Sequence, residues 1–139
     1  MKYLCLAYYD VKTFESTSKD ELKAVVSQCP AHDAELRQSG HLLVQASLGE
    51  VTGTTTIRPK NGKPTVTDGP FTETKEQVGG FFMIEARDLN EAILIASKHP
   101  AAHLGEQLGW AIEVRPIRFW EQPADLPKIH HEEPYQCVS

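Results

Sequence analysis

The residues best placed for chemistry lie in a polar segment between two strand-forming runs, within residues 65–85. The first run ends at Asp68-Gly69-Pro70, a polar stretch follows at 72–77, and Gly79-Gly80 leads into a second, apolar run. A polar loop held between two strands can aim side chains such as the Asp68 carboxylate at a ligand. Asp68 could equally be a turn residue that hydrogen-bonds its own backbone, and composition alone leaves both interpretations open.

Four of the six histidines raise the question of a metal site. His99 and His103 are four residues apart, but Pro100 between them disrupts the helical geometry that a HxxxH site needs. His130 and His131 are adjacent, so they point apart in an extended chain. We therefore expect no metal site. The sequence also lacks a phosphate-binding loop and a GxSxG elbow, and no cofactor is expected.

Charge and hydropathy argue against several classes of partner. The formal net charge is −5 at pH 7 and no basic stripe is present, so nucleic acid is not an expected partner. No apolar run approaches the ~20 residues that cross a bilayer, so a membrane is not expected either. The length of 139 residues predicts one domain. The three cysteines are widely spaced and form no CxxC pair, which favours a reducing, cytoplasmic location.

The first half of the chain predicts one strand and a helical region. Residues 2–9 form a strand that is covered on both sides, and residues 10–17 form a loop. Ser18 begins a helix, with Glu21 three residues later as in a capping box. The helix is expected to bury one face, which consists of Leu22, Val25, Val26 and Cys29.

Pro30 interrupts this helix, and it suits either the first turn of a new helix or a kink in one long helix. Helical residues resume over 31–37, and Gly40 is a typical C-terminal cap. His32 lies four residues before Leu36, so the two share a helix face. Because Leu36 is a predicted core residue, His32 is expected to turn inward. There it is either functional or a partly buried histidine with its hydrogen bonds satisfied.

The second half of the chain predicts five strands and one helix. The strands cover residues 41–48, 54–58, 64–67, 79–86 and 111–116. Asn61-Gly62 is the strongest hairpin signal in the chain, and it joins the second and third of these strands. Asp88 caps the helix, which ends before Pro100.

This order of elements, β-α-β, a hairpin and β-α-β, is typical of a ferredoxin-like α+β fold: an antiparallel sheet with helices on one face. One layer of helices leaves the other face of the sheet bare, and a second copy of the chain is the simplest cover. We therefore expect a homodimer. The domain is predicted to span residues 1–118, and residues 119–139 an extended C-terminal arm.

Two further side chains are candidates for contact with a ligand. Phe71 follows the Asp68 turn, where it either lines a pocket or belongs to the core. Arg115 alternates with Ile112 and Val114, so it faces away from their apolar side. There it could bind an anionic ligand or pair with a nearby carboxylate.

Several segments of the chain together resemble one known family, and Asp68-Gly69-Pro70-Phe71 is one of these segments. The others include Gly79-Gly80-Phe81, Asp88-Leu89-Asn90-Glu91-Ala92, Pro100-Ala101-Ala102 and the run from Ile112 to Ile117. Together these segments resemble the DGPF branch of the YCII-related family, and the resemblance covers residues 1–118.

This resemblance implies a dimeric α+β barrel, in which two ferredoxin-like sheets pack face to face around a cavity. It also implies a catalytic histidine–aspartate pair in that cavity, acting on a small organic compound by isomerisation or elimination. His32 resembles the family histidine in its placement, and Asp68 closes a strand at a loop expected to border the cavity. His32 is then the catalytic base, and Asp68 is the carboxylate that fixes its tautomer.

A second hypothesis is a non-catalytic module that binds a small ligand or regulates transcription. Proteins that resemble this branch are associated with extracytoplasmic-function sigma factors, so the resemblance makes a sigma factor a candidate partner. A filled or wholly apolar barrel interior would favour this second hypothesis over the first.

Overall fold

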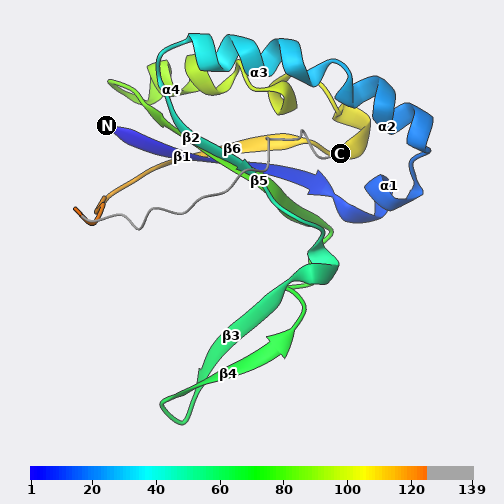
Figure 1. The fold of residues 1–139 in the computed structure, drawn as a ribbon, viewed down its shortest axis with the longest axis vertical. Coiled ribbons are helices and arrows are strands. Elements are labelled where there is room, and N and C mark those ends of the chain that lie inside the picture. The colour runs from blue at the N-terminus through cyan, green and yellow to red at the C-terminus, as the bar shows by residue number, and fades with distance from the viewer. Residues whose placement is uncertain (125–139) are drawn as a thin grey trace.

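A four-stranded antiparallel sheet forms the centre of the protein, with its strands in the spatial order β2-β5-β1-β6 (Figure 1). The strands are β1 (Lys2–Asp10), β2 (Leu42–Ser47), β5 (Glu76–Glu85) and β6 (Ala111–Pro116). The structure is a computed structural model, and it describes residues 1–124 of the chain. β1 and β5 are the inner strands, and they pair with each other along nearly their whole length.

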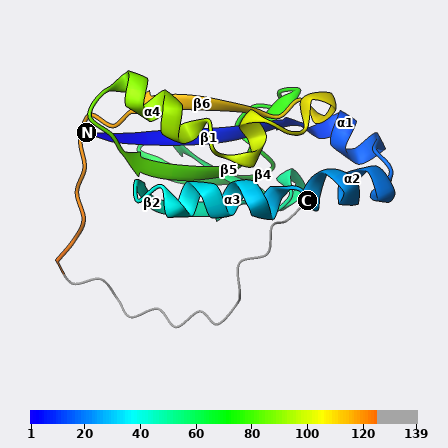
Figure 2. The same cartoon turned by 90° about the horizontal axis from the view of Figure 1, so that it is seen from above.

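The helices of the two β-α-β units lie on one face of this sheet (Figures 1 and 2). The helices of the chain are α1 (Val11–Ser16), α2 (Lys19–Val26), α3 (Cys29–Gln38) and α4 (Leu89–Ala96). The first unit runs from β1 through α3 to β2, and the second runs from β5 through α4 to β6. The predicted α+β class and the ferredoxin-like order of elements are therefore confirmed.

Alternation along the strands decides which side chains meet the helices. In β1, Tyr3 and Cys5 are 2% and 0% exposed and belong to the core, whereas Leu4 and Leu6 lie on the opposite face. The rest of the core cluster comes from β5, α3, α4 and the segment between β5 and α4, namely Leu36, Phe82, Ile84, Ala86, Ala92, Ile95 and Ala96. Each large side chain buried in this way stabilises the fold by roughly 1.5–3 kcal/mol.

The prediction of a loop over residues 10–17 is wrong, because α1 forms there. The Asp10 carboxylate caps this helix by accepting a hydrogen bond from the backbone N–H of Thr13, at 3.1 Å. Asp10 is 7% exposed, and its carboxylate lies 3.4 Å from the Lys75 ammonium. A helix of six residues is too short to show an apolar periodicity, so the capping aspartate was its one sequence signal.

The helical region that follows matches the predicted caps. Ser18 Oγ accepts a hydrogen bond from the Glu21 backbone N–H at 3.2 Å and so caps α2. Pro30 lies in the first turn of α3, so the chain starts a new helix there and does not kink a longer one. Gly40 follows α3 with a φ of 77°, a left-handed conformation that glycine adopts without strain.

The predicted hairpin forms a separate two-stranded sheet that projects away from the main sheet (Figure 1). Its strands are β3 (Thr55–Lys60) and β4 (Lys63–Asp68). The turn has a positive φ at both Asn61 (54°) and Gly62 (76°), as a type I′ turn requires. Pro59 and Pro64 face each other across the hairpin. In a hairpin with a two-residue turn, the second residue pair from the turn exchanges no backbone hydrogen bonds, and Pro59–Pro64 is that pair. The two prolines lack an N–H group, but no hydrogen bond between the strands is lost.

Short 3-10 helices complete the connections: η1 (Val51–Gly53), η2 (Pro100–Ala102) and η3 (Glu106–Leu108). The last two lie in the segment between α4 and β6, which borders the site described below. Across residues 1–124, no helix has the length and apolar character needed to cross a membrane.

The predicted C-terminal arm is described only in part. Phe119 is 75% exposed, and the Lys2 ammonium lies 5.7 Å from the ring centroid of Trp120. Residues 125–139, which include His130, His131 and Cys137, lie outside the described range. The domain boundary at residue 118 stays a prediction.

Candidate functional site

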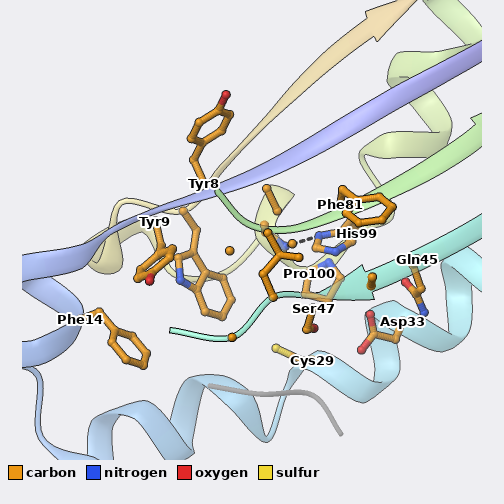
Figure 3. A pocket seen from close by; sticks show the side chains of 18 of the residues that line it. Tyr8, Tyr9, Phe14, Cys29, Asp33, Gln45, Ser47, Phe81, His99 and Pro100 are labelled. Atoms are coloured by element: carbon orange, nitrogen blue, oxygen red, sulfur yellow. Dashed lines mark hydrogen bonds between the residues drawn. The ribbon is translucent and has the colours of Figure 1, made fainter. Parts of the chain in front are cut away.

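A pocket of about 170 Å³ lies at one end of the sheet, on the face that carries the helices (Figure 3). We call it the helix-side pocket. The ends of β1 and β2, the start of β5, the N-terminal half of α3 and the segment between α4 and β6 form its walls. Its lining includes the small residues Ala7, Gly79 and Gly80, the aromatic residues Tyr9, Phe14 and Trp110, and the polar residues Asp33, Gln45 and His99.

The pocket exists because the helix-facing side chains of the sheet become smaller toward this end. Cys5 pairs with Phe82 in the core, and one step along the same face Ala7 pairs with Gly80 at the pocket. α3 therefore meets no bulky side chain here, and space remains between helix and sheet. Gly80 is also required by the neighbouring strand, because a Cβ there would lie 2.9 Å from the carbonyl oxygen of Ala46.

Asp33 is the buried carboxylate of the pocket, with 3% of its surface exposed. It points from α3 into the pocket together with Cys29 (Figure 3). Within residues 1–124, no group donates a hydrogen bond to this carboxylate and no close ion pair forms with it. Burial raises the pKa of Asp33 above its ordinary value, and the nearby charges of Arg37 and His32 lower it in part.

His99 lines the same pocket as an uncharged side chain. Its ring stacks on Phe82, with centroids 4.7 Å apart and planes 2° apart. The backbone N–H of Ala101 donates to its Nδ1 at 3.0 Å, so Nδ1 carries no proton and Nε2 is the donor. Burial, followed by the charge of His32, lowers the pKa of His99 from 6.5 to about 4. His99 is thus a neutral hydrogen-bond donor at pH 7 and a poor base.

His32 is outside the lining of the pocket but is coupled to it by charge. Its ring stacks on that of His103, with centroids 4.9 Å apart and planes 12° apart. Its charge is among the causes that lower the pKa values of Asp33 and His99. Leu36, which shares its helix face, is fully buried as predicted, whereas His32 is half-buried.

Comparison with known proteins identifies the family of the chain. The profile of the YCII-related domain matches residues 1–121. The chain belongs to the YCII-related family. An uncharacterized protein of Rhizobium meliloti (strain 1021) is 34% identical over 127 residues, which make up 91% of this chain and 99% of that protein. The family resemblance drawn from the segment that begins at Asp68 and its companions is therefore confirmed.

One solved structure is similar over most of the length of this YCII-related chain. It is the 5-chloro-2-hydroxyhydroquinone dehydrochlorinase of Burkholderia phenoliruptrix AC1100, in complex with 2,5-dihydroxybenzoquinone. The two chains are 18% identical with a TM-score of 0.40, over 88% of this chain and 96% of that one. A likeness of this degree supports no conclusion about the chemistry of the present protein.

The predicted catalytic pair of this YCII-related protein is not formed within one chain. Asp68 ends β4, as predicted, but it is exposed on the hairpin. The hairpin projects away from α3, which carries His32 (Figure 1). A pairing of His32 with Asp68 would need an assembly of more than one chain, and their catalytic roles stay a prediction.

The two predicted ligand contacts also lie outside the helix-side pocket. Phe71 is 67% exposed and so is not a core residue; the Arg58 guanidinium lies 4.5 Å from its ring centroid. It borders a second pocket, of about 620 Å³, at the base of the hairpin. Arg115 faces away from the helices, opposite Leu4, and its Nε lies 3.8 Å from Glu113 Oε1. The structure thus matches the alternative of carboxylate pairing, and a ligand role for Phe71 or Arg115 stays a prediction.

Histidines 99 and 103 belong to no group of potential metal ligands among residues 1–124. Pro100 starts η2 directly after His99, so the two rings are not on one helical face. No three histidine, cysteine, aspartate or glutamate side chains in the described part of the chain are arranged to hold a metal ion.

The sequence interpretation missed Asp33 and undervalued His99. Cys29, Asp33 and Leu36 are the buried residues of α3, and their spacing of four and three is that of a buried helix stripe. An acidic residue within such a stripe was the available signal. For His99 the signal was its position before Pro100, because its ring then caps the short helix that the proline begins.

Proposed function

We propose that this YCII-related protein binds a small organic molecule in the helix-side pocket and that Asp33 moves a proton to or from that molecule. One observation carries the proposal: Asp33 is 3% exposed, lines a pocket, and receives no hydrogen bond from residues 1–124. A carboxylate buried in this way destabilises a folded protein, so a functional role accounts for its presence. Groups with perturbed pKa values gather at sites of catalysis and binding.

The neighbours of Asp33 suit it to proton transfer. Removal from water raises its pKa and makes the carboxylate a stronger base, whereas the charges of Arg37 and His32 keep the ionised form accessible. His99 does not compete as a base, since its pKa is about 4. Its Nε2–H supports the proposal as a donor that could orient a ligand oxygen.

The proposed reaction class is proton transfer of the kind that isomerisation and elimination require. This is the class that the family resemblance implies, with a different base in the central role. Asp33 replaces His32 in the proposal because the His32 ring stacks on His103 and is not part of the lining. In this proposal Asp33 is the base, and the charge of His32 lowers the pKa of Asp33.

A generic substrate, 1,2-benzisoxazole, tests Asp33 as a base. The base removes the proton on the ring carbon, the N–O bond breaks, and 2-cyanophenolate forms with a measurable absorbance. We expect the protein to accelerate this reaction over buffer and Asp33→Asn to slow it by at least about tenfold. Glu35→Gln is the matched control, because it removes a carboxylate from the exposed side of the same helix. Equal rates for all three proteins would contradict the proposal.

Thermal unfolding of the same variants separates function from folding. Because the pKa of Asp33 is raised in the folded protein, its ionised form is disfavoured there, and folding stability decreases as the pH rises through the raised pKa. Asp33→Asn should therefore raise Tm at pH 7 by about 2–5 °C. The gain should shrink as the pH falls toward 3.8, the ordinary pKa of the group. A slower reaction in a more stable protein is the signature of a functional residue.

A further inference from the structure

The charged side chains among the described residues that line the helix-side pocket are all acidic. Of the described residues that line it, none is a lysine or an arginine, while Asp33 and Glu50 are both acids. His99 is neutral at pH 7, because burial lowers its pKa to about 4. No lining side chain can therefore form the charge-assisted pair that usually holds a carboxylate or a phosphate. A bound anion would instead meet the charge of Asp33 in a poorly solvated site.

One end of the pocket is aromatic, and the other end carries polar side chains beside Phe81 (Figure 3). At the aromatic end, the rings of Tyr9 and Phe14 meet edge to face, with centroids 5.5 Å apart. Asp33 and Gln45 lie at the opposite end (Figure 3). A molecule that fills both ends must have an apolar part and a polar part.

The ring of Trp110 is held at this pocket by the backbone. Gly105 packs against it so closely that a Cβ there would lie 2.2 Å from the indole. The contact fixes a large flat surface in the pocket wall. Such surfaces favour planar or ring-shaped apolar groups.

The volume limits the size of the buried part of a ligand. The pocket measures about 170 Å³. An apolar cavity of about 150 Å³ in another protein binds one benzene molecule. The helix-side pocket therefore has room for one six-membered ring and a short substituent.

We infer that the ligand of this pocket is a one-ring organic compound that carries no negative charge and presents an O–H or N–H group to Asp33. The inference rests on the proposed function, since it names the ligand class of the same site. The ring occupies the end formed by Tyr9 and Phe14, and Trp110 adds a further flat surface to the lining. The O–H or N–H group supplies the hydrogen bond that residues 1–124 do not give to Asp33, which compensates the carboxylate for its lost water.

Three probes with the same ring test the inference on the full chain: benzylamine, benzyl alcohol and benzoate. At pH 7 they carry a positive charge, no charge and a negative charge. We expect benzylamine and benzyl alcohol to bind with Kd values at least about tenfold lower than that of benzoate, as measured by protein-observed NMR titration. The resonances that shift should include those of Asp33 and Trp110.

Variants locate the source of this discrimination. Asp33→Asn should weaken benzylamine binding by at least about tenfold and remove the disadvantage of benzoate, because the repelling charge is gone. Glu35→Gln should leave all three affinities unchanged, since Glu35 lies on the exposed side of α3. Trp110→Ala should weaken the three probes alike, because it removes a contact with the ring they share.

The outcomes separate this inference from the proposed function. Benzoate binding as tightly as the other two probes would overturn the ligand class and leave the pocket as a small-molecule site. Discrimination that survives in Asp33→Asn would overturn it too, because Asp33 would not be its source. If no probe binds while benzisoxazole is still opened, the ligand class alone is wrong. If no probe binds and benzisoxazole opens no faster than in buffer, both proposals are wrong.

Discussion

At the scale of single residues, His99 shows how the fold fixes a protonation state. Its ring lies flat on Phe82, inside the layer between sheet and helices, and its Nδ1 is occupied by the backbone N–H of Ala101. Adding a proton would place a charge in that layer. For this reason the pKa of His99 falls from 6.5 to about 4, with the charge of His32 as a second cause.

The low pKa of His99 predicts a specific loss of stability in acid. Between pH 6.5 and pH 4 the unfolded chain binds a proton at this position and the folded protein does not, so the free energy of unfolding falls as the pH falls through this window. The full loss is about 3 kcal/mol. His99→Asn keeps a side chain able to cap η2 and removes the titrating ring, so its stability should depend less on pH. Urea unfolding at three pH values within and above the window measures the difference.

A half-exposed histidine provides the control for this prediction. His41 contacts the carbonyl oxygen of Glu85 through Nδ1 at 2.8 Å, on the surface of the protein. His41→Asn makes the same substitution at the surface of the protein, so it measures the effect of exchanging a histidine for an asparagine outside the core. If His99→Asn and His41→Asn change the pH dependence of the free energy of unfolding equally, the burial of His99 is not the cause of that dependence.

Single residues of the site were the hardest feature to predict from the sequence. The expectation that Leu36 is buried was right, but helical spacing placed His32 inward when the buried positions of α3 are Cys29, Asp33 and Leu36. Adjacent residues on a helix differ by about 100° in direction, so an error of one position exchanges a buried side chain for a half-buried one. The pocket itself depends on small residues that pair across neighbouring strands, as Ala7 and Gly80 do. The register in which two strands pair cannot be read from the sequence alone.

At the scale of elements, the β3–β4 hairpin is the part of the described chain that depends most on its own turn. Its two strands pair only with each other within residues 1–124. An isolated two-stranded hairpin is marginally stable in water. The two positive φ values at Asn61 and Gly62 therefore carry much of its stability.

A single methyl group at the turn should loosen this hairpin and leave the main sheet intact. Gly62→Ala places a Cβ at a φ of 76°, which costs roughly 1–2 kcal/mol. We expect the backbone amides of Arg58 and Thr65 to exchange with deuterium about tenfold faster or more, with no change at Phe82 in β5. Gly53→Ala is the matched control, because Gly53 has an ordinary φ and open space around it. Faster exchange at Phe82 as well would mean that the two sheets do not unfold independently. Unchanged exchange at Arg58 and Thr65 would mean that the turn does not limit the stability of the hairpin.

Most elements could be predicted because each has a local signal. The Asn61-Gly62 turn, the Ser18 cap and the helix start at Pro30 all depend on residues within one or two turns of chain. α1 was missed because its stabilising contacts are not local. Its capping residue Asp10 is fixed by burial and by Lys75, which lies 65 positions further along the chain.

At the scale of the whole molecule, the order of strands and helices was predictable because it follows from alternation between period-two and helical patterns. The ferredoxin-like arrangement needs no information beyond that order. The direction in which the hairpin projects is different, since no local pattern sets it. Asp68 ends its strand as predicted, but the sequence did not indicate that the hairpin carries it away from α3 and His32 of the same chain.

The face of the sheet opposite the helices predicts how many chains assemble. By strand alternation it carries Leu4, Leu6 and, at the edge, Val44, which is 44% exposed, together with the charged side chains Glu113 and Arg115 on β6. Apolar side chains left exposed on a sheet face favour contact with a partner. A second copy presents the same face, so two chains can bury it symmetrically. We expect a dimer with twice the 15.5 kDa of one chain in multi-angle light scattering.

A charge placed on this face should separate the two chains without unfolding them. Val44→Glu changes a side chain that is partly exposed in the single chain, so folding should tolerate it, whereas a charge buried between two copies disfavours association. Leu94→Glu is the control, because Leu94 is 70% exposed on the outer side of α4, away from this face. We expect Val44→Glu to elute as a monomer with unchanged circular dichroism and Leu94→Glu to remain a dimer. A natural chain that is monomeric at micromolar concentration would rule out this assembly.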